Sequence, residues 1–144
     1  MAKVFLMVDP ATVALEPAPI PKEWILEGTP VARSTKLISS NDRISCVLVW
    51  DCSPGSFRWH YTKEETVFVL SGEAFMSNGN GGERRLAAGE VGFFPAGYSC
   101  DWRVTQHFRK VAVHREGMWL PLGLGLKAWN KFLIWIGLSK KSAL

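Results

Sequence analysis

Cysteine is scarce in this 144-residue chain: Cys46, Cys52 and Cys100 are its three copies, and none belongs to a Cys-x-x-Cys pair. An odd number of cysteines without that spacing argues against a disulfide framework. It favours a reducing compartment instead, so we expect a cytoplasmic protein.

Long apolar runs and strong charge are absent as well. No stretch reaches the roughly 18 uninterrupted apolar residues that span a membrane, and Asp9-Pro10 ends the early apolar run 4–8 before it could serve as a secretory signal. The net charge of +4 is mild, and no basic helix interleaved with aromatic residues appears. The sequence therefore predicts no nucleic-acid partner.

Aromatic residues and short β-prone segments are what the chain does have. Seven Trp and eight Phe are enough to line a pocket as well as fill a core. Runs of β-branched and aromatic residues alternate with Gly, Asn, Ser and Pro turn signals, which predicts an all-β domain. The expected strands cover residues 31–38, 43–51, 56–61, 66–70, 73–77, 83–87, 91–94, 99–104 and 108–114, after a first strand at about 3–8 and a Pro-rich connector at 16–21.

One helix is expected near the C-terminus, over residues 126–138. Trp129, Phe132, Leu133 and Ile136 share one helical face by their spacing of three, four and seven. The preceding segment 121–125, with its Pro and two Gly, is expected to break the chain before the helix begins. The helix could dock on its own domain, join two copies or touch a membrane surface, and we favour docking or a homodimer over membrane contact.

Two motifs with characteristic spacing carry a resemblance to a known family. Six residues separate Glu65 from Gly72, and five separate Gly89 from Pro95, which Gly97 and Cys100 follow. These segments resemble the second halves of the two cupin motifs. The resemblance implies a cupin double-stranded β-helix, a jelly-roll barrel, here with one C-terminal α-helix. It divides the chain into an N-terminal strand and connector (1–23), a cupin barrel (24–116) and a C-terminal amphipathic helix with its tail (117–144).

A narrower resemblance covers residues 24 to 114. The runs 24–33, 49–59, 102–104 and 109–111 are similar to small single-domain cupins of the kind found in (S)-ureidoglycine aminohydrolase and in the ethanolamine-utilisation cupin.

The chain departs from the metal-binding cupin pattern. The resemblance implies two His and one Glu from the first motif and a third His from the second. Here only Glu65 matches, because the His positions of the first motif fall on Trp59/Tyr61 or on Arg58/His60, and Cys100 occupies that of the second. We prefer the Trp59/Tyr61 alignment. Since a catalytic Zn or Fe site normally takes about three protein ligands, we expect no bound transition metal. The cofactor, if one exists, stays unidentified.

The candidate site is the barrel interior. By the period-two rule, Trp59 and Tyr61 share the inward face of one strand, and His60 points outward. The motif alignment adds Glu65, Cys100 and Trp102, which completes the expected ligand-binding set. We expect burial to raise the pKa of Glu65, which makes it a candidate acid/base or substrate anchor. Alternatively, Glu65 is a structural carboxyl, protonated or bonded to Tyr61, that holds the mouth of the barrel.

The roles expected for Cys100 and for the three histidines are less specific. Cys100 is either a soft ligand or a small buried hydrophobe. His60, His107 and His114 are expected at the surface or at strand ends. Two functions follow: a protein that binds a small organic molecule in its pocket, with Glu65 as acid/base if it is an enzyme, or a non-catalytic binding or accessory cupin that has lost its metal site.

Overall fold

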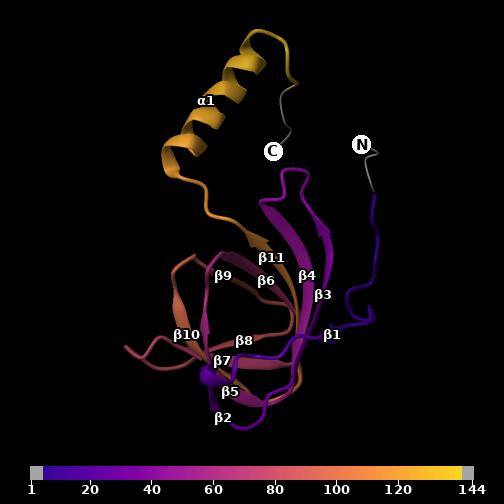
Figure 1. The fold of residues 1–144 in the computed structure, drawn as a ribbon, viewed down its shortest axis with the longest axis vertical. Helices are drawn as coiled ribbons and strands as arrows, with labels where there is room; N and C mark the ends of the chain where they lie inside the picture. Colours follow the sequence, from indigo (N-terminus) through magenta and orange to yellow (C-terminus); the bar gives the residue numbers. More distant parts are fainter. Residues whose placement is uncertain (1–4, 141–144) are drawn as a thin grey trace.

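The computed structural model describes residues 5–140. Two antiparallel sheets face each other below a detached C-terminal helix (Figure 1). A single-turn 3₁₀ helix, Lys22–Trp24, precedes β2. The strands are β1 (Glu16–Pro17), β2 (Ile25–Glu27), β3 (Ala32–Ser39), β4 (Ser45–Cys52), β5 (Gly55–His60), β6 (Glu64–Ser71), β7 (Glu73–Ser77), β8 (Arg84–Ala87), β9 (Val91–Phe94), β10 (Ser99–Val104) and β11 (Phe108–Arg115), and the helix is α1 (Leu120–Trp135).

The chain alternates between the two sheets. One sheet has the order β1-β3-β4-β11-β6-β9 and the other β2-β5-β10-β7-β8. The chain therefore crosses from one sheet to the other between β4 and β5, between β5 and β6, between β9 and β10, and between β10 and β11. Every neighbouring pair is antiparallel. This arrangement is a jelly roll, which confirms the predicted all-β cupin fold with one C-terminal helix.

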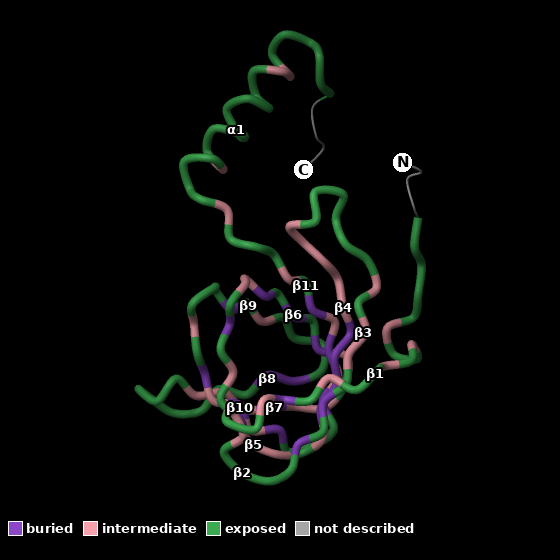
Figure 2. Tube along the Cα trace, viewed as in Figure 1, coloured by how far each residue is buried: buried purple, intermediate pink, exposed green. Residues whose placement is uncertain are grey.

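The core lies between the sheets, and most of the buried residues in Figure 2 belong to their strands. On β6, Glu65, Val67 and Val69 are buried while the residues between them are exposed, as the alternation of a half-buried strand requires. Phe57 of β5 and Trp102 of β10 stack at 6.0 Å between ring centroids. The aromatic residues thus fill the barrel from its five-stranded side.

A glycine of the first motif closes the β6–β7 turn. Gly72 has φ +78°, and a Cβ added there would lie 2.1 Å from the carbonyl oxygen of His107. Only a residue without a side chain permits that approach at that backbone angle. The motif spacing from Glu65 to Gly72 is therefore the length of one strand plus its obligatory turn.

The two ends of the chain differ from expectation. Residues 5–8 form no strand, and the rest of the strand expected at 3–8 lies outside the described residues. The Pro-rich segment instead contributes β1, an edge strand paired to β3, where Pro17 costs little because an edge strand can spare a donor.

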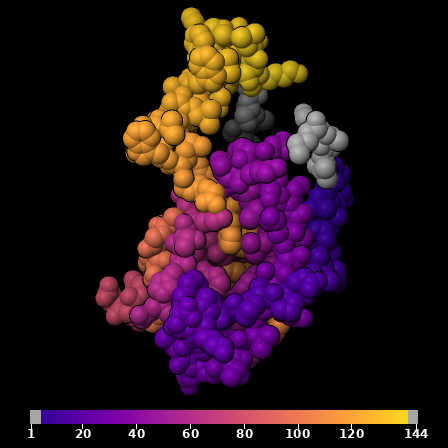
Figure 3. Space-filling model, in the orientation of Figure 1, coloured from indigo at the N-terminus to yellow at the C-terminus, as the bar shows by residue number. Residues whose placement is uncertain are grey.

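The helix begins earlier than predicted. α1 starts at Leu120 and includes the segment 121–125 that was expected to break it, so that expectation was wrong. Pro121 lies in the first helical turn, where its missing N–H has no intrahelical partner to lose. No residue of α1 is buried, and the helix stands away from the barrel (Figure 3), so docking on its own domain is also wrong. No helix within residues 5–140 is long and apolar enough to cross a membrane.

The N-terminal segment is held to the barrel by a buried ion cluster. Asp51 of β4 is fully buried and accepts hydrogen bonds from Arg33, at 2.6 and 3.0 Å, and from Arg109, at 3.3 Å. Arg109 also donates to the backbone oxygens of Pro10, at 3.0 Å, and Val13, at 2.8 Å. One arginine therefore connects the last strand of the barrel to the start of the described chain.

Candidate functional site

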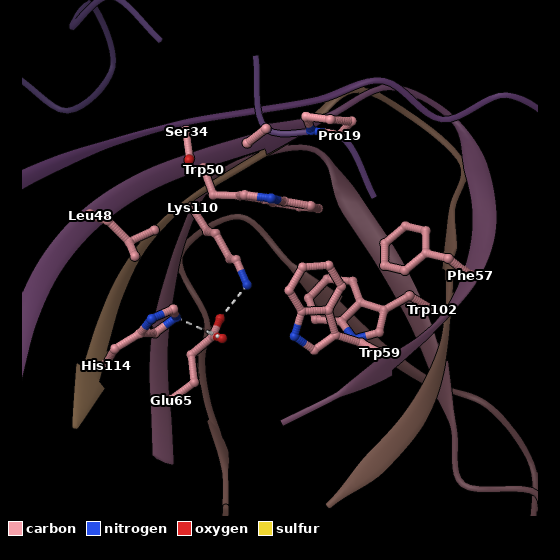
Figure 4. A pocket seen from close by; sticks show the side chains of 11 residues that line it. Pro19, Ser34, Leu48, Trp50, Phe57, Trp59, Glu65, Trp102, Lys110 and His114 are labelled. Carbon is pink, nitrogen blue, oxygen red and sulfur yellow. Dashed lines mark hydrogen bonds and ion pairs between the residues drawn. The ribbon is translucent and has the colours of Figure 1, made fainter. Parts of the chain in front are cut away.

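A cavity of about 300 Å³ lies between the two sheets. Both sheets contribute to it, and the segment before the 3₁₀ helix closes one side (Figure 4). Its size is at the lower end of the range for small-molecule pockets. The lining residues are Ala18, Pro19, Ser34, Leu48, Trp50, Phe57, Trp59, Glu65, Trp102, Lys110 and His114.

One wall of the cavity is aromatic. Trp59 of β5 lies edge-on to Trp50 of β4, with ring centroids 6.1 Å apart, and Trp50 is 6.2 Å from Trp102. Phe57 and Trp59 are two residues apart on one strand, so the pleat places both on the inward face. Edge-to-face packing fixes these rings, so the wall presents indole faces and edges at angles to one another toward the cavity.

The opposite end is polar and comes from two neighbouring strands. Lys110 and His114 lie four residues apart on the inward face of β11, and His114 pairs in register with Glu65 of β6. The Lys110 ammonium donates to Oε1 of Glu65, and His114 Nε2 lies 3.0 Å from Oε2 (Figure 4). The carboxylate is thus held by one partner on each oxygen.

The pKa of Glu65 falls, contrary to the sequence prediction that it would rise. Burial does act to raise it, but the nearby Lys110 charge and the hydrogen bonds from His114 and Lys110 outweigh that effect. The result is a pKa lowered from 4.5 to about 2. Glu65 is therefore an ionised acceptor at neutral pH, because a buried carboxyl with an adjacent cation keeps its charge.

Lys110 is buried too, and it contacts the aromatic wall. Its Nζ lies 4.9 Å from the ring centroid of Trp50 and 4.9 Å from that of Trp102. A cation over aromatic faces gains from their negative quadrupoles, most of all when it has lost its water. Lys110 consequently joins the polar end of the cavity to its apolar wall.

The structure brings three of the five predicted ligand-binding residues to this cavity. Trp59, Glu65 and Trp102 line it, whereas Tyr61 and Cys100 do not. The buried Tyr61 hydroxyl accepts a hydrogen bond from Trp102 Nε1 at 3.0 Å, and its ring stacks on Phe94 at 4.6 Å. Tyr61 therefore supports the wall from behind, and it does not bond Glu65.

Cys100 borders a second cavity of about 430 Å³, which is lined mainly by residues of β7, β8 and β9. Burial raises the pKa of its thiol to about 11, so the thiolate form is disfavoured at neutral pH. Of the two interpretations offered by the sequence, the small buried hydrophobe agrees better with this environment.

Sequence reasoning missed Lys110 and His114. Val111 and Val113, which alternate with them on β11, lie on the other face of the strand, and Val113 is exposed. A usable signal was electrostatic: a buried carboxylate such as Glu65 needs a cation, and Lys110 alternates in phase with the apolar residues Phe108 and Ala112. His60 is exposed as predicted and lies 2.7 Å from the Ser99 hydroxyl.

The residues at the cupin ligand positions do not fit a metal. Both oxygens of Glu65 are engaged, one by an ammonium group that would repel a cation. Cys100 faces a different cavity, and Trp59 offers no donor atom for a metal. Between residues 5 and 140, no three His, Cys, Asp or Glu side chains gather closely enough to hold an ion.

Solved structures share this fold. A protein of unknown function of the DUF861 family from Pseudomonas syringae pv. tomato superposes with a TM-score of 0.67 at 23% identity, over 74% of this chain and 46% of that one. This chain therefore spans less than half the length of that protein. The Clostridium difficile EutQ protein superposes with a TM-score of 0.60 at 17% identity, over 78% of this chain and 88% of that one.

A third structure, a putative ethanolamine utilization protein Q from Salmonella typhimurium, gives a TM-score of 0.53 at 22% identity, over 61% of this chain and 72% of that one. These identities establish the shared fold alone, and no curated protein matches the sequence. The model of the EutQ-like cupin domain matches residues 39–112, about half of the chain, and includes β4 to β10 with most of the cavity. The resemblance to small cupins is confirmed: this chain belongs to the EutQ-like cupin domain family.

Proposed function

We propose that the protein binds a small, partly planar organic molecule in the cavity between its sheets. The observation that carries this proposal is the pairing of an aromatic wall with a fixed polar end in one cavity. Trp50, Trp59 and Trp102 supply flat apolar contact, and Glu65, Lys110 and His114 supply hydrogen-bonding groups. Ligand pockets combine these two elements.

The charge balance of the polar end favours a neutral ligand group. Lys110 and Glu65 neutralise one another, so the pair presents a donor and an acceptor side by side without net charge. A group that both accepts and donates, such as a carboxamide, complements that pair better than a carboxylate or an ammonium group does. The preferred ligand class is therefore a planar amide.

Binding is favoured over acid/base catalysis by Glu65. A general base works best when its pKa lies near the operating pH, and that of Glu65 is lowered to about 2. The carboxylate is also committed to two partners. This observation supports the non-catalytic binding or accessory role, in which Glu65 is an anchor that keeps its charge.

Titration with three matched probes tests the proposal. Benzamide, benzoate and benzylamine share one ring and differ in the charge of the polar group. We expect saturable shifts of the Trp59 indole resonance with benzamide, and weaker effects with the two ions. No saturable shift with any of the three probes, or a preference for benzylamine, would contradict the proposed ligand class.

Two variants on one strand locate the binding. Ser34 lines the cavity, whereas Thr35, its neighbour on β3, falls on the opposite face by the strand alternation. Ser34→Leu fills the cavity and should abolish the benzamide shifts. Thr35→Leu adds the same side chain outside and should leave them unchanged; equal responses from the two variants would place binding elsewhere.

A further inference from the structure

The C-terminal helix presents an apolar surface that the barrel does not cover. None of its residues is buried, and the aromatic side chains Trp129 and Trp135 are 57% and 82% exposed. Trp119, just before the helix, is 72% exposed. An exposed apolar surface of this extent marks an interaction site, because monomeric proteins rarely leave one to water.

The helix has one wholly apolar face and one that carries lysines. Counting from Leu122, offsets of 4, 7, 10, 11 and 14 put six residues on one side by the 3.6-residue period. Lys127, Asn130 and Lys131 lie on the other side, which also carries Leu120, Leu124 and Trp135. The apolar face consists of Leu122, Leu126, Trp129, Phe132, Leu133 and Ile136.

The net positive charge of the chain comes from this C-terminal segment. Residues 117–144 contain four Lys and no Asp or Glu, which accounts for the entire net charge of +4. Residues 1–116 consequently carry equal numbers of positive and negative side chains. A second copy of the neutral barrel offers this segment no complementary charge, whereas a surface of anionic lipid does.

Length and aromatic content agree with a helix that lies along a bilayer. Sixteen residues extend about 24 Å, less than the hydrocarbon thickness. Trp129 lies on the apolar face at the middle of that length, Trp119 and Trp135 lie at its two ends, Trp135 on the side of the lysines, and tryptophan favours the headgroup boundary. Lys127 and Lys131 can extend from the polar face toward headgroups.

We propose that α1 is an interfacial helix that binds the surface of membranes containing anionic lipids. Its apolar face enters the boundary between headgroups and acyl chains, and its lysines contact the phosphates and carboxylates above. The barrel, tethered through residues 116–119, remains in the aqueous phase beside the membrane. This proposal is independent of what the barrel cavity binds.

Vesicle co-sedimentation of the full chain tests the proposal. We expect binding to vesicles with about one third phosphatidylserine in phosphatidylcholine, at least tenfold weaker binding to pure phosphatidylcholine, and loss of binding at high salt. Insertion should also shift the tryptophan emission to shorter wavelength. Failure to bind the anionic vesicles would overturn the proposal.

Matched variants separate the helix from general electrostatics. Lys127→Glu/Lys131→Glu should reduce binding at least tenfold, and Leu126→Asp/Trp129→Asp should abolish it. Lys36→Glu/Arg84→Glu makes the same change in net charge at exposed barrel positions and should bind nearly as well as the parent. An equal loss in this control would overturn the assignment to α1.

Sedimentation velocity without lipid tests the alternative that a second copy of the chain covers the apolar face of α1. If a second copy covers this face, Leu126→Asp/Trp129→Asp will convert an oligomer into a monomer, and the proposal is wrong. We expect the variant and the parent to have the same oligomeric state.

Discussion

At the scale of single residues, the pairing of Glu65 with Lys110 governs both the stability of the barrel and the chemistry of its cavity. Each side chain is buried, so removing either one leaves the other charge without its main partner. Uncompensated buried charges are costly, whereas a pair replaced together can be nearly neutral. This asymmetry gives the pair a measurable signature.

A double-mutant cycle should reveal that signature. We expect Glu65→Gln and Lys110→Met each to lower the free energy of unfolding by about 3 kcal/mol. The double variant should lose less than the sum by about 1–3 kcal/mol. Urea denaturation measures all four proteins.

The exposed pair of Arg58 and Asp101, with 2.7 Å between its closest atoms, is the control. Water screens both groups, so the cycle of Arg58→Gln and Asp101→Asn should show far smaller coupling. Equal coupling free energies in the two pairs would mean that burial does not strengthen the Glu65–Lys110 interaction.

Acid should remove the Glu65 contribution within a defined window. Because the folded protein lowers the carboxyl's pKa from 4.5 to about 2, folding favours the ionised form. That contribution, about 3 kcal/mol, is complete above pH 4.5 and declines as the pH falls toward 2. The stability difference between the parent and Glu65→Gln should therefore shrink across this range, while a pH-independent difference would contradict the lowered pKa.

At the scale of elements, the sequence predicted most of the strands because turn chemistry bounds them. Residues 73–77, 91–94 and 99–104 were expected as strands and match β7, β9 and β10. Gly and Asn positions fix where such strands end, whatever the rest of the molecule does. The helix start was missed because Pro121, Gly123 and Gly125 usually break a helix, and only the position in the first turns makes them tolerable.

The candidate site was predictable only in part for a related reason. Trp59, Glu65 and Trp102 follow from strand alternation and motif spacing, which are local properties. The pairing of Glu65 with Lys110 and His114 depends on the register between β6 and β11, which are separated by 36 residues of intervening chain. Cys100 shows the limit of strand alternation, since a buried residue on the same face of β10 as Trp102 can border a different cavity.

The β6–β7 turn provides a prediction at the same scale. Gly72→Ala places a Cβ against backbone of the β10–β11 turn in a left-handed conformation, so we expect a loss of about 3 kcal/mol or more. Gly81→Ala, in the β7–β8 hairpin, has a conventional φ and open space around its Cβ. It should change the free energy of unfolding by less than about 0.5 kcal/mol. Similar losses in both variants would contradict the steric explanation.

At the scale of the whole molecule, the homodimer expected from the sequence stays a prediction, and the outer face of the six-stranded sheet is where we propose it forms. Val91 and Phe93 of the edge strand β9 are 64% and 59% exposed on that face, and Phe68 of the neighbouring β6 is 47% exposed. Phe93→Asp should convert a dimer at tens of micromolar into a monomer by sedimentation equilibrium.

Leu26→Asp is the control for that experiment. Leu26 is 54% exposed on the other sheet, so the substitution adds the same charge away from the proposed interface. A parent that sediments only as a monomer, or dissociation by Leu26→Asp as readily as by Phe93→Asp, would contradict this interface.

Metal content is a second whole-molecule prediction. Since the Lys110 ammonium occupies the coordination space beside Glu65, we expect freshly purified protein to contain no stoichiometric transition metal by elemental analysis. One equivalent of metal per chain, lost on Glu65→Gln, would contradict that expectation and restore the metalloenzyme hypothesis.

The contact between Arg109 and residues 10–13 has a consequence for the order of assembly during synthesis. Its two backbone acceptors precede the arginine by 99 and 96 positions, so the N-terminal segment leaves the ribosome long before its binding partner exists. Interactions between such distant positions form late, because closing the intervening chain costs entropy first. Residues 10–13 therefore cannot make this contact until β11 has emerged, whereas the neighbouring β1 can already pair with β3.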